Sequence, residues 1–201
     1  RKTGLIAIKL RDNDSLEWVK ETSKGNEVVI ITKTGKSIRF KEDDARPMGR
    51  ASIGVRGIKL RSDDIVVEMD VVPEPEVTSL LVVMENGLGK MTKISDYRLQ
   101  TRGGTGVKTA NITSKTGNVI GAKVIHANTD ADLIMISKSG QVIRLHSKHI
   151  PSQGRATQGV YLMRLRPKDK VASISLMSIE IEEEVTEKAE EKSEQQKLIK
   201  S

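Results

Sequence analysis

Short apolar runs of four to six residues alternate along the chain with turns that contain glycine or aspartate. Four such runs fill one representative stretch of the sequence: Leu133–Ile136, Gln141–Leu145, Val160–Leu165 and Val171–Leu176. The connection Lys138-Ser-Gly140 has the composition of a hairpin turn, because glycine supplies a positive φ without steric cost. Runs of this kind, separated by turn residues, predict antiparallel strands and an all-β fold.

The apolar runs differ in how many of their faces are hydrophobic. The segments 28–31 and 80–83 are apolar on both faces, which is typical of a strand buried between neighbouring sheets. The next run alternates, as in Lys36-Ser-Ile-Arg-Phe40, and predicts a strand with one solvated face. Arg39 and Arg144 share a position on that run, so we expect both side chains to be solvated.

One block of the sequence occurs three times without a gap. Each copy has a hairpin glycine, an arginine fifteen residues later and a Gly-Val pair nineteen residues later: Gly35, Arg50, Gly54; Gly87, Arg102, Gly106; Gly140, Arg155, Gly159. A period of 52 to 53 residues with strands inside it predicts a propeller-like repeat, a β-pinwheel of four-stranded blades. The segment 4–11 parallels 54–61, so the chain begins inside a unit and we expect it to be a piece of a longer protein.

The expected division is a partial unit at 1–27, three complete blades at 28–77, 78–130 and 131–177, and a tail at 178–201. The tail has eight Glu against four Lys, which gives a net charge of −4, and we expect it to be disordered. Residues 1–177 then have thirty basic against nineteen acidic side chains, a net charge of +11. A basic body beside an acidic tail indicates a polyanion as partner, with the tail as its competitor; the alternative is that both charges serve only solubility.

Composition narrows the class of protein further. Only four residues are aromatic, so the core must be aliphatic, and the lack of cysteine excludes disulfides and thiolate metal sites. No signal peptide or eighteen-residue apolar run supports secretion or membrane insertion. The three histidines form no metal-ligand grouping with acids, and neither Tyr97 nor Tyr161 has a nucleophile–base arrangement. We therefore expect no cofactor, no metal and no catalytic site in this chain.

The long connection between the second and third run of each copy is rich in glycine and arginine and keeps its length. A loop of that size with constant length is typical of a functional segment. Glycine allows close backbone approach to phosphate, and arginine offers a bidentate fork. Two structural alternatives stay open: the glycines allow a tight strand entry, and the arginines are simply solvated.

The loop sequences resemble the C-terminal domain of DNA gyrase A. The segments Arg46-Pro-Met-Gly-Arg50 and Gln153-Gly-Arg-Ala-Thr-Gln-Gly159 match that family's blade segments. The segment 100–106 is similar to its Gln-Arg-Arg-Gly-Gly-Lys-Gly box, with Thr101 and Thr105 in place of Arg and Lys. An eroded box is also typical of the related protein of topoisomerase IV, but the two matching segments favour gyrase.

The resemblance implies a six-bladed β-pinwheel in which neighbouring blades exchange strands, and a non-catalytic module that wraps double-stranded DNA to support negative supercoiling. The strand-cleaving tyrosine would lie on a separate domain, and the partners would be DNA, the rest of gyrase A and gyrase B. A cytoplasmic, nucleoid-associated location follows. A propeller that binds an acidic protein is the alternative, and an enzyme is the third, which no group of residues supports.

The candidate residues come from these loops and the basic residues around them. The expected DNA contacts are Arg46, Arg50, Arg56, Lys90, Lys93, Arg98, Arg102, Lys108 and Arg155. The box-like loop consists of Gln100, Arg102, Gly103, Gly104 and Gly106. Because one arginine recurs in each unit of a ring, we expect a track of positive charge that contacts phosphates without reading sequence.

Overall fold

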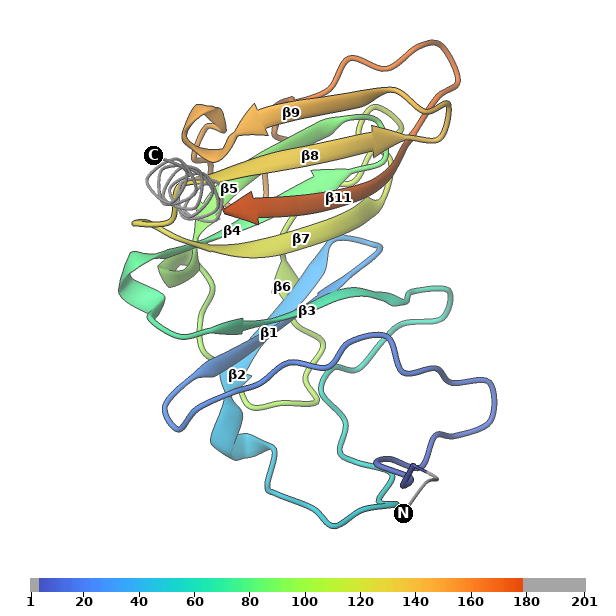
Figure 1. The fold of residues 1–201 in the computed structure, drawn as a ribbon, viewed down its shortest axis with the longest axis vertical. Helices are drawn as coiled ribbons and strands as arrows, with labels where there is room; N and C mark the ends of the chain where they lie inside the picture. The colour runs from blue at the N-terminus through green and yellow to red at the C-terminus, as the bar shows by residue number, and fades with distance from the viewer. Residues whose placement is uncertain (1–3, 179–201) are drawn as a thin grey trace, which may run out of the picture.

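The computed structural model describes residues 4–178, which form three antiparallel sheets stacked along the long axis of the molecule (Figure 1). The strands are β1 (Glu27–Thr32), β2 (Lys36–Lys41), β3 (Val66–Val72), β4 (Thr78–Met84), β5 (Leu88–Lys93), β6 (Val107–Lys108), β7 (Val119–His126), β8 (Ala131–Ser137), β9 (Val142–His146), β10 (Val160–Tyr161) and β11 (Val171–Ser178). Four 3₁₀ turns connect them: η1 (Glu42–Asp44), η2 (Pro75–Val77), η3 (Ile94–Asp96) and η4 (Ser147–His149). The predicted all-β fold is confirmed.

Each four-stranded sheet takes its outer strand from the next unit of the repeat. The strand orders are β3-β1-β2-β6, β10-β5-β4-β7 and β11-β8-β9. Thus β6 belongs to the second unit but pairs with β2 of the first, with Ser37 opposite Val107. In the same way β10 of the third unit pairs with β5 of the second, with Gly89 opposite Val160. The strand exchange implied by the family resemblance is therefore present at both junctions.

Strand exchange also corrects the expected three complete blades. The run Val160–Leu165 forms a strand only at 160–161, and this strand adds to the middle sheet rather than to its own. The third sheet consequently has three strands within the described chain, because no later unit supplies its outer strand there. Residues 4–26 add no strand to any sheet, and β11 continues to Ser178, the first residue of the expected tail. The rest of the tail, 179–201, lies outside the described residues.

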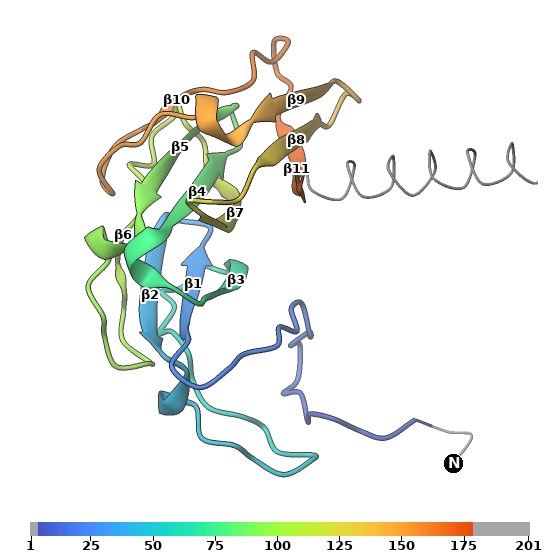
Figure 2. The same ribbon diagram turned by 60° about the vertical axis from the view of Figure 1, so that its left-hand side comes forward.

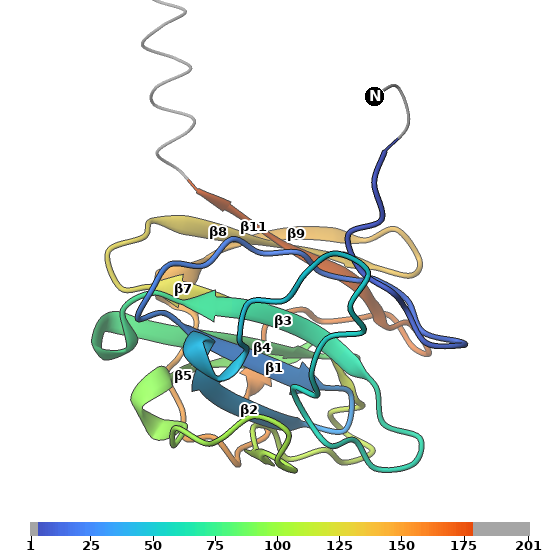
Figure 3. The same ribbon diagram turned by 90° about the horizontal axis from the view of Figure 1, so that it is seen from below.

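The sheets are arranged as a crescent (Figure 2), with β6 and β10 along its outer side and β3, β7 and β11 along its inner side. Viewed from below, the strands of successive sheets lie one above another (Figure 3). The inner strands are in contact, β3 with β7 and β7 with β11. The successive outer edges therefore form one continuous side of the molecule.

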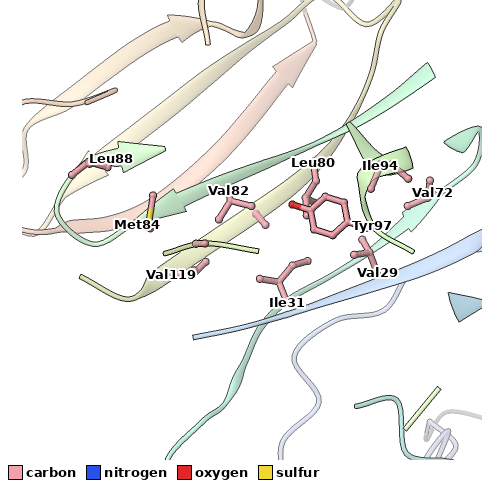
Figure 4. Packing of buried hydrophobic residues seen from close by; sticks show 12 residues of the cluster. Val29, Ile31, Val72, Leu80, Val82, Met84, Leu88, Ile94, Tyr97 and Val119 are labelled. Carbon is pink, nitrogen blue, oxygen red and sulfur yellow. The ribbon is translucent and has the colours of Figure 1, made fainter. Parts of the chain in front are cut away.

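Alternate residues of the first strand of each unit fill the space between sheets (Figure 4). Val29 and Ile31 of β1 pack with Leu80, Val82 and Met84 of β4 in one buried cluster. The other face of β4, with Leu81 and Val83, packs with Leu133 and Met135 of β8 in a second cluster. Because β4 is covered by a sheet on each side, its apolar pattern on both faces is explained.

The Arg39 side chain is only 11% exposed and is therefore not solvated, which corrects the expectation for this residue. Its guanidinium pairs with Glu27 on the neighbouring strand and donates from Nη1 to the carbonyl oxygens of Ile94 (3.0 Å) and Tyr97 (2.8 Å) in the next unit. Arg144, at the same position of the third unit, pairs with Asp132, and half of its side chain is exposed. In the first unit this strand thus carries a cation that joins it to the second unit, whereas the middle unit has Met91 at the same position.

Two glycines allow the exchanged strands to approach their neighbours. Gly106 and Gly159 have φ of +69° and +76°. A Cβ at Gly106 would lie 2.4 Å from the carbonyl oxygen of Ser37, and one at Gly159 would lie 2.5 Å from that of Gly89. Gly54 has a φ of +81°, but a Cβ there would meet nothing within 4 Å. At the two junctions, therefore, tight strand entry alone explains the recurring glycine.

Substituting Gly106 by alanine should destabilise the fold more than substituting Gly54. Both changes cost about 1 kcal/mol for the positive φ, but only Gly106→Ala also forces β6 away from β2, for a total of about 3 kcal/mol. Chemical denaturation of the two variants measures the difference. Equal losses would show that close approach of β6 to β2 does not contribute to stability.

An aspartate before the inner strand holds the hairpin turn of the same unit. Asp64 accepts hydrogen bonds from the backbone nitrogen (3.0 Å) and the hydroxyl (2.6 Å) of Thr34. In the third unit Asp169 accepts the same two hydrogen bonds, from the backbone nitrogen and the hydroxyl of Ser139. Burial opposes ionisation of Asp64, but the bonds from Thr34 outweigh it, so its pKa is lowered. The hydroxyls of Ser139 and Ser137 lower the pKa of Asp169 to about 2.

The third hairpin should therefore lose stability in acid. Asp169 has a lower pKa in the folded chain than its ordinary value of 3.8, so its contribution is complete above about pH 4 and is lost as pH falls towards 2. Asp169→Asn should lower the denaturation midpoint at pH 7. Between pH 4 and pH 2 the midpoint of this variant should fall less than that of the wild type. Asp43→Asn, at an exposed acid of η1, is the control. A wild-type fall that Asp169→Asn leaves unchanged would contradict this assignment.

Candidate nucleic-acid interface

At each junction the long loop runs along the outer edge of the preceding sheet before it enters that sheet. The backbone nitrogen of Gln100 donates to the carbonyl oxygen of Arg39 at 2.8 Å, and that of Gln153 donates to Met91 at 2.8 Å. Further along the loops, the backbone nitrogen of Lys59 donates to the carbonyl oxygen of Gly104 (2.8 Å). The backbone nitrogen of Asn111 likewise donates to the carbonyl oxygen of Thr157 (3.0 Å). These contacts repeat at equivalent positions, so the two loops lie on the outer side of the crescent in the same way.

The box-like loop is held against the first unit. Arg102 donates from Nε to the carbonyl oxygen of Asp44 (2.7 Å) and from Nη1 to that of Arg56 (3.2 Å). The backbone nitrogen of Gly103 donates to Gly57. Gln100, Arg102, Gly103 and Gly104 are all half-buried. The structure thus brings the box-like residues together with Arg56, which lies on the loop of the preceding unit.

Arg155 makes the equivalent contact one unit later. Its Nη1 donates to the carbonyl oxygen of Lys108 at 3.1 Å, and its guanidinium carbon lies 5.9 Å from the centre of the Tyr97 ring. Lys108 and Arg56 both stand two residues after the second glycine of their units. Arg102 and Arg155 are therefore not simply solvated: each joins its loop to the unit before it, and each keeps other N–H groups for a further acceptor.

Six of the expected contact residues are exposed: Arg46, Arg50, Arg56, Lys93, Arg98 and Lys108. Within residues 4–178 none of the six forms an ion pair with an acid, and Lys108 donates only to the side-chain oxygen of Asn111, at 2.9 Å. Their charges are not neutralised by the protein. Uncompensated positive charge therefore lies on the loop of the first unit (Arg46, Arg50 and Arg56), on either side of η3 (Lys93 and Arg98) and on β6 (Lys108).

Lys90 is not on the surface, which corrects its assignment as a direct contact. Its side chain is fully buried, and Nζ donates to the carbonyl oxygens of Gly154 (2.7 Å) and Arg155 (2.6 Å) and to the Thr157 hydroxyl (3.0 Å). Burial, and then the charge of Arg155, lower its pKa to about 8. The sequence did not reveal this, because β5 resembles an alternating strand, although the loop 153–157 covers the face of β5 that carries Lys90.

The structure adds cations that the sequence analysis did not select. Lys115 lies 5.6 Å from the centre of the exposed Tyr161 ring, and both line a surface hollow with Arg166 and Lys168. Tyr161 occupies the position of Arg56 and Lys108 in the repeat, which is the signal that could have identified this place. The hollow extends the basic side to the third unit.

Other kinds of site find no support among the described residues. Histidine and acidic side chains nowhere gather in groups of three that could hold a metal ion within 4–178. His146 instead pairs with Asp130, at 2.5 Å. In the same residues no helix is long and apolar enough to cross a membrane.

Comparison with known proteins places this geometry in a family. The family described as "DNA gyrase C-terminal domain, beta-propeller" matches residues 1–23, 26–73, 78–126 and 131–176. The DNA gyrase A protein of Staphylococcus aureus strain NCTC 8325 is 41% identical over 186 residues, which cover 92% of this chain and 21% of the relative. The same protein of strain MRSA252 is 42% identical over 183 residues, 91% of this chain and 20% of the relative. The chain thus spans about a fifth of the length of these relatives.

Solved structures give the same result. The C-terminal domain of DNA gyrase A superimposes with a TM-score of 0.75 and 30% identity, and covers 87% of this chain and 58% of that one. The C-terminal domain of DNA topoisomerase IV has a TM-score of 0.79 at 20% identity, with 87% and 53% covered, and shows the fold alone. Four matched segments fill most of this chain, and the gyrase A relatives are more than 40% identical to it. The chain therefore belongs to the DNA gyrase C-terminal domain family.

Proposed function

We propose that this chain binds double-stranded DNA along the outer side of the crescent and bends it, as part of a gyrase A protein that acts with gyrase B in the cytoplasm. The observation that supports this most directly is the repeated outer-edge loop, whose exposed cations have no acidic partner within residues 4–178. Bending and binding require no bond to be broken, so the proposal assigns no catalytic residue to this region.

The geometry favours contact with phosphates rather than with base edges. The cations belong to successive units whose outer strands follow one convex side (Figure 2), so a rigid straight duplex would reach only part of them. Bending a 20–30 base-pair site by 40–90° costs about 1–6 kcal/mol, which several phosphate contacts must offset. Such contacts fix the position of the duplex without reading its sequence. We therefore expect similar affinities for unrelated DNA sequences.

The proposal can be tested with two variants that lose the same charge. Arg56→Gln/Lys108→Gln removes two cations from the outer loops. Lys20→Gln/Lys123→Gln removes two cations beside the inner strands, where they pair with Asp70 and Glu68. If both outer cations contact phosphates, the first variant should lower the slope of log affinity against log salt by about 2, whereas the second leaves it unchanged. Fluorescence anisotropy with a duplex of about 40 base pairs measures both slopes.

Two results would contradict the proposal. Equal slopes for the two variants would show that net charge alone attracts DNA and that the outer side has no special role. Weak DNA binding that does not respond to salt, together with tight binding to an acidic protein, would instead favour the protein-interaction alternative.

A further inference from the structure

Among residues 4–178 the buried ammonium of Lys90 donates hydrogen bonds only to the loop that carries Arg155. It lies on β5, and its three hydrogen bonds go to Gly154, Arg155 and Thr157. Within the described chain it has no acidic partner. A charge buried without a counter-ion costs stability, even when its N–H groups are all used. The side chain therefore needs an explanation other than stability.

The repeat shows that the fold does not require a cation at this position. The equivalent residues, three after the hairpin glycine, are Ile38 in the first unit and Ile143 in the third. Ile38 is fully buried and makes ordinary apolar contacts in its unit. Of the three units only the middle one has lysine there, and this lysine lies under the loop that carries Arg155.

Lys90 and Thr92 act on the same loop from the same face of β5, because alternate residues of a strand share a face. The Thr92 hydroxyl donates to the carbonyl oxygen of Gln153 at 2.8 Å, while Lys90 bonds the next two carbonyls. The backbone of Arg155 is thus held from below. Its side chain is held separately, by the carbonyl oxygen of Lys108 and the Tyr97 ring.

We propose that Lys90 is a positioning residue for DNA binding: its ammonium fixes the backbone of residues 153–157, so that the guanidinium of Arg155 is directed to a phosphate. This inference rests on the proposed function. Without the ammonium, the two carbonyls would turn to solvent, and the loop would take several conformations in which Arg155 points elsewhere. A purely structural lysine would have no such effect on affinity.

A double-mutant cycle tests the inference. Lys90→Met keeps the length of the side chain and removes the charge, and Lys90→Ile installs the residue type of the other units. Neither variant should be less stable than wild type, because a buried charge is replaced by apolar atoms. Arg155→Ala should weaken DNA binding about tenfold. Lys90→Met should weaken it by a similar factor, and the double variant should bind no more weakly than Arg155→Ala alone.

Lys138→Met is the matched control, since it removes one exposed lysine from the β8–β9 turn. Hydrogen exchange without DNA supplies an independent readout: Lys90→Met should accelerate exchange at residues 153–158 but not at 100–106. Additive effects of Lys90→Met and Arg155→Ala, or unchanged exchange in the loop, would overturn the inference. So would an Arg155→Ala variant with wild-type affinity.

The two proposals fail in different ways. If wild type does not bind DNA, the proposed function fails, while the exchange experiment still decides whether Lys90 holds the loop. A measurement on the unsubstituted chain covers the case in which no variant folds. The ¹⁵N signal of the Lys90 side chain should be protected from solvent exchange and should shift when duplex DNA is added, and an unchanged signal would overturn the positioning role.

Discussion

Completion of the first two sheets by a strand from the next unit is the constraint on which the rest of the structure depends. The exchange fixes where glycine must stand, because β6 and β10 enter so close to β2 and β5 that a Cβ would collide with a carbonyl oxygen. It also fixes the path of the long loop, which has to run along the outer edge of the preceding sheet before it pairs. The same constraint therefore produces both the stacking of the units and the surface on which the cations stand.

The cations at the junctions divide into two groups by what their side chains contact. Arg39, Arg102 and Arg155 donate to backbone carbonyls of a neighbouring unit and so hold the junctions together. Arg56 and Lys108 provide the carbonyls and point their own side chains to solvent. The recurring arginine is thus explained in part by the fold. The exposed cations beside it therefore support nucleic-acid binding more strongly than the arginine does.

Much of the fold could be predicted from the sequence, because strand periodicity and the glycine register are local signals. The double burial of β4 is an example, since its apolar run already indicated a sheet on each side. The sequence was less informative where a contact joins distant units. Arg39 resembled a solvated residue because the carbonyls it binds, at Ile94 and Tyr97, lie more than fifty residues away. Lys90 was misplaced for the same reason, and no residue beside it in the sequence indicates burial.

Strand exchange has a consequence for how such a chain is made. Lys36 pairs with Lys108, so the first sheet is not complete until 72 more residues have been synthesised. At about 5–20 residues per second, β2 remains an open edge for roughly 4 to 14 seconds. Open edges pair readily with other chains, and charged side chains are one of the means by which proteins prevent this. Lys36, Arg39 and Lys41 place three cations on this six-residue strand, which is the kind of charge that keeps an open edge from pairing with other chains.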